Sequence, residues 1–159
     1  MPAELNQKAP DFTTKVCDGE KFEDFTLSKE LGKENIVLAF FPLAFSPPCT
    51  NEMCSFRDNL SQFSSLKARV YGISVDSPFV LNAFIKAHDL KFKLLTDFNR
   101  EISRAYGVLH EDLMGLKGVS KRSVFVIDKN GVVRYKWVSD DPRQLPDLAA
   151  IRAALGKLS

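Results

Sequence analysis

Two continuous apolar runs, each followed by a helical pattern, constrain the fold more than any other feature of this sequence. The runs cover residues 37–41 and 70–75, and their β-branched and aromatic side chains favour strands that are covered on both faces. After each run, apolar residues recur at spacings of three and four, as on the buried side of a helix. The first set is Met53, Phe56, Leu60 and Phe63, and the second is Val80, Phe84 and Ala87. This order of strand, helix, strand and helix predicts parallel strands joined by crossover helices.

A β-hairpin and a last helix complete the predicted fold. Residues 123–127 and 132–137 flank Asn130-Gly131, a pair whose positive φ angles form a tight hairpin turn. Residues 145–155 then have the period of an amphipathic helix. We therefore expect an α/β fold with a mixed central β-sheet flanked by helices, in an order that resembles the thioredoxin-like sandwich. Because no repeat or linker interrupts the chain, residues 1–159 are expected to form a single domain.

The composition indicates a globular protein whose partner is a small molecule or another protein. The chain is 45% hydrophobic and 26% charged, which excludes collagen-like and disordered classes. Its net charge of +2 is spread without a basic block, so we expect no binding to nucleic acid or to an anionic membrane. The longest apolar stretch, residues 36–45, has half of the ~20 residues that cross a bilayer. The polar amino terminus shows no secretory pattern, so we expect a cytoplasmic protein.

Three cysteines are too few for a structural disulfide framework, and only two of them lie close together in the sequence. These two are Cys49 and Cys54, whereas Cys17 stands alone in a polar segment and is expected to be a bystander. The first apolar strand ends at Pro42. The following Ser46-Pro47-Pro48 favours the start of a helix that carries Cys49 in its first turn.

A cysteine in the first turn of a helix lies near unpaired backbone N–H groups and the positive end of the helix dipole. Both stabilise the thiolate, which is the nucleophilic form of the side chain. The alternative interpretation of Cys49 is a buried cysteine that acts as a small hydrophobic residue. Its position directly after two prolines favours the nucleophile.

Cys54 lies five residues after Cys49, a separation that does not suit a disulfide within an intact helix. On an ideal helix it corresponds to a turn of ~140° and a distance of roughly 8.6 Å between the Cα atoms. Disulfides rarely tolerate more than ~7 Å. A bond between the two cysteines therefore requires the first turns of the helix to unwind. The alternative is that Cys54 is a thiol on the helix face without a partner.

The sequence around Cys49 resembles the active-site motif of peroxiredoxins, Pro-x-x-x-Thr/Ser-x-x-Cys, as Pro42-x-x-x-Ser46-x-x-Cys49. Residues 49–58 are similar to the Q-type branch, the bacterioferritin comigratory proteins of the thiol-specific antioxidant and alkyl hydroperoxide reductase family. That branch keeps its resolving cysteine five residues downstream. Residues 8–12, 95–97, 105–108 and 122–128 agree with the same family. Residues 40–45 are also similar to the one-cysteine peroxiredoxins named for an actinobacterial alkyl hydroperoxide reductase, which lack the residue matching Cys54.

This resemblance implies a thiol-dependent peroxidase acting on hydrogen peroxide and organic hydroperoxides. Cys49 would attack the O–O bond as the peroxidatic nucleophile and become a sulfenic acid. Cys54 would then form an intramolecular disulfide with it, and a thioredoxin- or glutaredoxin-like protein would reduce that disulfide. The resemblance leaves the choice between monomer and homodimer open.

The resemblance also assigns supporting roles around the sulfur. The hydroxyl of Ser46 would bond the thiolate and the incoming peroxide, and Arg122 would place a positive charge beside both. Pro42 would cover the sulfur, and Glu52 would orient an arginine. Ser46 stands where threonine is commoner in the family, so the hydroxyl is kept and the γ-methyl group is lost.

Two other functions compete with this hypothesis. One is a one-cysteine peroxidase that takes its resolving thiol from outside the chain. The other is a redox-responsive binding module or holdase, in which unwinding of the helix exposes apolar residues such as Met53 and Phe56. Neither His88 nor His110 has a spacing that completes a zinc site with the cysteines, and we expect neither a metal nor another cofactor.

Overall fold

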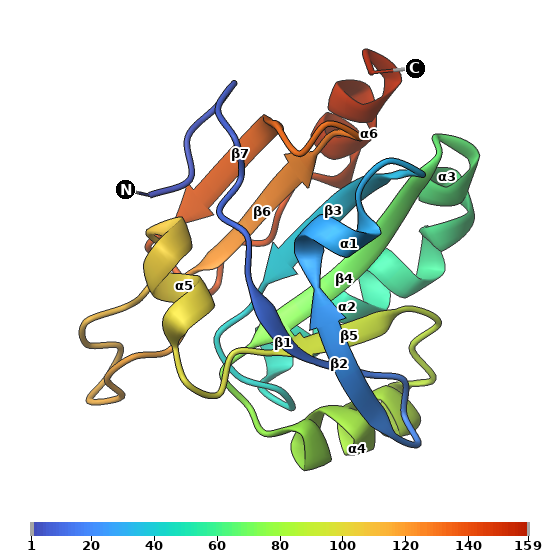
Figure 1. The fold of residues 1–159 in the computed structure, drawn as a ribbon. Helices are drawn as coiled ribbons and strands as arrows, with labels where there is room; N and C mark the ends of the chain where they lie inside the picture. Colours follow the sequence, from blue (N-terminus) through green and yellow to red (C-terminus); the bar gives the residue numbers. More distant parts are fainter. Residues whose placement is uncertain (1, 159) are drawn as a thin grey trace.

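The computed structural model describes residues 2–158, whose strands form a seven-stranded sheet in the order β2-β1-β5-β4-β3-β6-β7 (Figure 1). The strands are β1 (Thr13–Cys17), β2 (Phe22–Thr26), β3 (Asn35–Phe40), β4 (Ala68–Ser74), β5 (Lys93–Thr96), β6 (Arg122–Ile127) and β7 (Val133–Ser139). The helices are α1 (Leu27–Glu30), α2 (Pro47–Asp58), α3 (Leu60–Ser65), α4 (Pro78–His88), α5 (Glu101–Tyr106) and α6 (Leu148–Gly156).

The sheet is mixed, as the sequence predicts. β3 pairs in parallel with β4, and β4 with β5, through crossovers that contain α2, α3 and α4. β6 lies antiparallel on the other side of β3 and continues into the antiparallel β7. β1 and β2 form a second antiparallel pair beside β5. The predicted α/β class and the crossover order are therefore confirmed.

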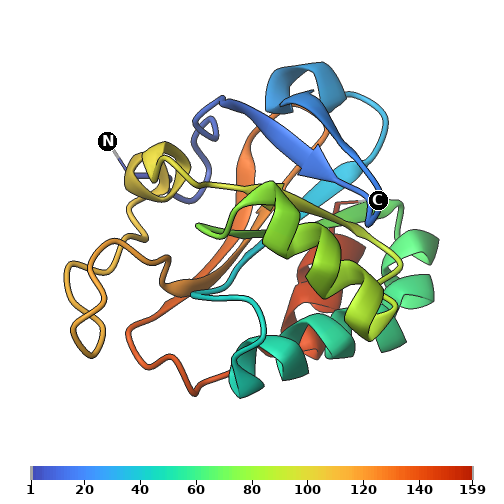
Figure 2. The same ribbon diagram turned by 90° about the horizontal axis from the view of Figure 1, so that it is seen from below.

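Helices cover both faces of the sheet (Figure 2). Side chains from α2, α3, α4 and α6 pack in one core cluster with the inward residues of β3 and β6. The second cluster, on the opposite face, takes its helical residues from α1 and α5. All six residues of β3 and all six of β6 are buried, which agrees with the continuous apolar runs that predicted these strands. No helix within residues 2–158 combines the length and the apolar character that a membrane span requires.

Gly72 lets α2 approach the middle of the sheet closely. A Cβ atom at this position of β4 would lie 2.8 Å from Met53 Sδ of α2 and 2.6 Å from Leu94 Cδ2 of β5. Both distances are too short for real side-chain contacts. The absence of a side chain at Gly72 therefore sets the depth at which α2 and its cysteines sit.

Three local predictions differ from the structure. In the turn between β6 and β7, only Gly131 has a positive φ, of 83°, whereas a positive φ was predicted for both Asn130 and Gly131. The Asp128 carboxylate holds this turn by accepting from the backbone N–H groups of Asn130 and Val132, both at 2.9 Å. The helical pattern through Phe63 is divided into α2 and α3 at Asn59. The last helix begins at Leu148, because Asp147 caps it through the N–H groups of the second and third residues.

The antiparallel pairing of β6 with β3 brings the functional side chains together. Phe40, at the end of β3, lies opposite Ser123 of β6. The start of β6 therefore lies at the sheet edge where the chain leaves β3 and enters α2. Residues that are far apart in the sequence, Arg122 and Cys49, meet at this edge.

Candidate active site

Cys49 lies in the first turn of α2, as predicted, and its residue is 1% exposed. Pro47 and Pro48 occupy the first two helical positions, where a missing N–H group costs nothing. Because neither proline has an N–H group, the first backbone donor of the helix belongs to Cys49 itself. Ser46 is the N-cap residue, and its carbonyl accepts from Thr50 N at 2.9 Å. The sulfur therefore lies at the positive end of α2.

A short loop between β3 and α2 fixes the entry into this helix. Pro42 is buried at its start, in keeping with a role in covering the site. Ala44 N donates to Asp76 Oδ2 at 2.7 Å, and the Ser74 hydroxyl donates to the same oxygen at 2.7 Å. Phe45 has a positive φ of 70°, and its ring packs against Phe84 with the ring centroids 5.0 Å apart. Two neighbouring segments, the end of β4 and α4, thus hold the loop in place.

The sequence patterns did not identify Asp76 as a residue that holds this loop. Its position just after β4 could have indicated this role, because the carboxyl ends of the adjacent parallel strands β3 and β4 meet at one edge of the sheet.

Arg122 holds the centre of the site from the first position of β6, where it is 1% exposed. Its Nη2 donates to Cys49 Sγ at 3.2 Å, and its Nη1 donates to Glu52 Oε1. Nε and Nη2 also donate to the Pro142 carbonyl at 3.1 and 2.7 Å. The structure therefore brings Arg122, Cys49 and Glu52 together, as the family resemblance implies. The Pro142 carbonyl was not predicted, because a backbone acceptor on a loop leaves no signal in the residue types.

Glu52 and Arg122 form a buried ion pair. Burial opposes the charged form of each group, and the opposite charge of the partner favours it. The side chain of Glu52 is 0% exposed, and burial raises the pKa of its carboxyl to about 7 against the opposing effect of Arg122. Burial also acts against the charge of Arg122, but Glu52 and Cys49 outweigh it and raise the pKa of the guanidinium. Arg122 is therefore a fixed cation beside the sulfur, and the pKa of the Glu52 carboxyl lies above its usual range.

Ser46 differs from its predicted role. Its hydroxyl donates to the Leu43 carbonyl at 3.0 Å, so its proton is directed into the loop and not at the Cys49 sulfur. Serine lacks the γ-methyl group that restricts χ1 in threonine, and the hydroxyl is free to take this local partner. The predicted bond between Ser46 and the thiolate is therefore not made in this conformation.

Cys54 is half-buried on the third turn of α2, and all three cysteines are free thiols. α2 is continuous from Pro47 to Asp58, so both Cys49 and Cys54 belong to one unbroken helix. Helical geometry then places their Cα atoms roughly 8.6 Å apart, beyond disulfide range. Cys17 is buried on β1, and burial, with Asp18 as the smaller cause, raises the pKa of its thiol to about 11. Such a thiol is a poor nucleophile at neutral pH.

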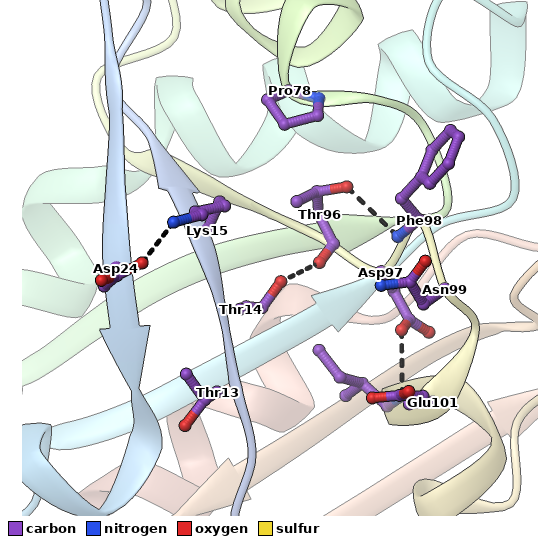
Figure 3. Close-up of a pocket in the computed structure, with 11 residues that line it drawn as sticks. Thr13, Thr14, Lys15, Asp24, Pro78, Thr96, Asp97, Phe98, Asn99 and Glu101 are labelled. Atoms are coloured by element: carbon purple, nitrogen blue, oxygen red, sulfur yellow. Dashed lines mark hydrogen bonds and ion pairs between the residues drawn. The ribbon is translucent and has the colours of Figure 1, made fainter.

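A separate pocket of about 330 Å³ lies between β1, β2 and the segment that follows β5 (Figure 3). Its polar groups are largely paired within the protein. Lys15 pairs with Asp24, and Thr14 donates to the Thr96 carbonyl. Asp97 accepts from Ile102 N at 2.9 Å and Ser103 N at 2.7 Å, which caps α5. The lining contains no cysteine, so this pocket does not share the chemistry of the Cys49 site.

Comparison with known proteins gives one consistent result. Residues 5–136 match the AhpC/TSA family. The chloroplastic 2-cysteine peroxiredoxin of Chattonella marina var. antiqua is 36% identical over 147 residues, which cover 88% of this chain and 73% of that protein. Peroxiredoxin-2 of Mus musculus is 38% identical over 148 residues, which cover 88% of this chain and 72% of that protein. The chain spans 52% to 73% of the length of four chloroplastic 2-cysteine peroxiredoxins, the Chattonella protein among them.

The solved structures agree with the sequence relatives. The crystal structure of the reduced 2-Cys peroxiredoxin of Plasmodium vivax has a TM-score of 0.87 and 28% sequence identity to this chain. The match covers 97% of this chain and 81% of that one. The predicted thioredoxin-like arrangement of sheet and helices is therefore confirmed.

Proposed function

Because the chain belongs to the AhpC/TSA family of peroxiredoxins and is a thiol peroxidase, we propose that it reduces hydrogen peroxide and organic hydroperoxides with Cys49 as the nucleophile. The observation that carries this proposal is the 3.2 Å contact between Arg122 Nη2 and Cys49 Sγ. This contact places the fixed positive charge of Arg122 beside the Cys49 sulfur, which already lies at the positive end of α2.

In the first step, the Cys49 thiolate attacks one oxygen of the peroxide. A bond forms between sulfur and oxygen, the O–O bond breaks, and the leaving oxygen takes up a proton to become water or an alcohol. The thiolate is oxidised to sulfenic acid and the peroxide is reduced.

Arg122 supports this step from a fixed position. Its bonds to Cys49, Glu52 and Pro142 use four of the five guanidinium N–H groups. We assign the fifth, on Nη1, to the peroxide as negative charge moves from sulfur to oxygen. Pro42, buried at the start of the loop, would limit access of water to the sulfur.

In the second step, Cys54 attacks the sulfenic acid. The sulfur of Cys49 releases its hydroxyl group as water, and a disulfide joins the two residues. The half-buried position of Cys54 on the same helix supports this step, provided that the first turns of α2 unwind. This resolution within one chain is the pattern of the Q-type branch, which the spacing of Cys49 and Cys54 favours. The relatives from Chattonella marina and Plasmodium vivax are named 2-cysteine peroxiredoxins, not Q-type proteins, so the assignment to the Q-type branch is our proposal.

A thioredoxin- or glutaredoxin-like protein would reduce the disulfide and return the chain to its dithiol form. Such a cycle needs a reducing compartment, and we place it in the cytoplasm. We further propose that the working unit is a monomer or a homodimer, which light scattering of the reduced protein will distinguish from a larger ring.

The test is oxidation of the reduced protein with one equivalent of peroxide, followed by intact mass and non-reducing peptide mapping. We expect a loss of about 2 Da and a peptide that links Cys49 to Cys54. A gain of about 16 Da on Cys49 with Cys54 still free would assign a one-cysteine mechanism. No reaction at Cys49 would contradict the proposal and favour a redox-responsive binding module.

A further inference from the structure

A small cavity lies beside Glu52, the acidic member of the ion pair with Arg122. It has a volume of about 120 Å³ and lies between α2 and the chain that leads from β7 into α6. Its lining residues are Glu52, Ser55, Asn59, Leu145, Pro146 and Leu148. This volume is sufficient for several water molecules, and the glutamate, serine and asparagine side chains offer polar partners.

Glu52, which lines this cavity, has one carboxyl oxygen without a partner in the part of the chain that the structure describes. Oε1 accepts from Arg122, whereas Oε2 is buried and has no hydrogen-bond partner among residues 2–158. Glu52 is the only fully buried member of the lining, and Ser55, Asn59 and Leu145 are all partly or largely exposed. The cavity therefore borders a buried carboxyl group whose second oxygen has no partner among residues 2–158.

The other charged groups on the elements around Glu52 include Arg57 on α2, Asp147 at the N-cap of α6 and Arg152 within α6. On α2, Arg57 bonds Asp58 at 2.9 Å and the His88 carbonyl at 2.5 Å. At the start of α6, Asp147 accepts from the N–H groups of the helix. Cys49 lies three residues before Glu52 on α2, and Arg122 donates to both side chains. A change in the charge of Glu52 therefore acts on the sulfur both directly and through Arg122.

We propose that Glu52 binds and releases a proton at Oε2 through this cavity, and that its charge state controls how strongly Arg122 acts on Cys49 and the peroxide. This inference rests on the proposed peroxidase function and makes Glu52 a positioning residue with a switchable charge. The proton moves between the Glu52 carboxyl and water in the cavity, and no electron is transferred.

The two charge states have opposite consequences for the reaction. When Glu52 is protonated, the full positive charge of Arg122 is available to the thiolate and to the leaving oxygen. When Glu52 is ionised, its negative charge neutralises part of that effect. Because burial raises the pKa of Glu52 to about 7, both states are populated near neutral pH. The reactivity of the Cys49 thiolate should fall as Glu52 ionises.

The first test measures the carboxyl directly, in the reduced protein and without peroxide. Glutamate labelled with ¹³C at the carboxyl carbon is followed by NMR as the pH is raised, and the Glu52 signal is assigned by its loss in Glu52→Gln. We expect a midpoint within about one pH unit of 7, well above the ~4.3 of a glutamate in a model peptide. A midpoint at or below about 5 would overturn the proposal, whatever the peroxide reaction at Cys49 shows.

The second test couples this titration to chemistry. The rate constant for oxidation of Cys49 by hydrogen peroxide is measured from about pH 5.5 to 8.5 in wild type and in Glu52→Gln, which is neutral at every pH. We expect the ratio of wild-type to variant rate to fall at least threefold across the Glu52 midpoint. The matched control Glu101→Gln, an exposed glutamate on α5, should keep a constant ratio. A constant ratio for Glu52→Gln would show that the two sites are uncoupled.

A third variant protects the test against misfolding of Glu52→Gln. Leu145 forms the outer wall of the cavity and is 40% exposed, so Leu145→Phe narrows the cavity without disturbing the core. Less water then reaches Oε2, and the Glu52 midpoint should rise further. An unchanged midpoint in this variant would refute the role of the cavity.

Discussion

The rotation of one hydroxyl decides whether Ser46 acts in the site or only in the loop. Its Oγ now donates to the Leu43 carbonyl, and a turn about χ1 would release it toward the N-terminus of α2. Ser46→Thr keeps the hydroxyl and restricts χ1, so we expect it to retain peroxidase activity. Ser46→Val has the shape of threonine without the donor and should lose about 100-fold in kcat/KM for hydrogen peroxide. A fully active valine variant, with a native circular dichroism spectrum, would remove the hydroxyl from the mechanism.

The guanidinium of Arg122 is both charged and planar. Its N–H groups point in several fixed directions, so it can donate to Cys49, Glu52 and the Pro142 carbonyl at the same time. Arg122→Lys keeps the charge, but one ammonium group cannot serve Cys49, Glu52 and the Pro142 carbonyl at once. We expect a loss of about 100-fold in kcat/KM and of about 3 kcal/mol in the free energy of unfolding, because Glu52 is left buried without its partner.

A double variant separates these two effects. Arg122→Met with Glu52→Gln removes both charges and should recover most of the stability, measured by urea unfolding, without any of the activity. Recovery of activity in this variant would show that Arg122 serves the fold alone.

At the scale of elements, the proposed cycle places two opposed requirements on α2. The helix is intact where it places Cys49 beside Arg122, and in the proposed cycle it has to open for Cys54 to reach the sulfur. Met53 and Phe56, both 0% exposed, anchor the helix in the core and oppose this opening. We expect hydrogen exchange of the amides of residues 50–54 to be much faster in the oxidised protein than in the reduced one. The matched variant Cys54→Ser should show no such increase after oxidation. A disulfide that forms with unchanged exchange would contradict the unwinding of α2.

The elements also show what the sequence predicts and what it leaves out. β3 and β6 are buried along their whole length and β4 is buried from Val70 onward, so each is visible as an apolar run in the sequence. β1 and β5 have only five and four residues; they pair with each other, and β1 also pairs with β2 and β5 with β4. Local patterns do not carry such pairing.

The features of the site also divide into those that local sequence predicts and those that depend on tertiary structure. The first turn of α2 and the position of Cys49 follow from Ser46-Pro47-Pro48 alone. The contact of Arg122 with Cys49 depends on the antiparallel register of β3 and β6, so only the family resemblance gave it. The Asp76 carboxylate, the Pro142 carbonyl and the rotamer of Ser46 are set by the tertiary structure. They were therefore outside the reach of sequence patterns.

For the molecule as a whole, the raised pKa of Glu52 gives folding stability a definite dependence on pH. Below about pH 4.5, the carboxyl is protonated in both the folded and the unfolded chain. Between this pH and about 7, the unfolded chain releases the proton that the folded chain keeps, so the free energy of unfolding falls as the pH rises. Above about 7 the loss is complete. The exposed Asp18 and Asp24 have lowered pKa values and act with the opposite sign, but below about pH 4.

The contribution of His110 to the pH dependence of stability falls in the same pH range. Burial lowers its pKa, so its contribution to stability rises with pH just below 6.5 and partly offsets the effect of Glu52. Comparison of wild type with Glu52→Gln removes this overlap, because both proteins contain His110. In urea unfolding of the reduced proteins, we expect the stability of Glu52→Gln relative to wild type to increase by on the order of 1–3 kcal/mol between about pH 4.5 and 7.5. Parallel curves for the two proteins would mean that Glu52 is ionised throughout this range, and that the burial of the pair is compensated by Arg122 alone.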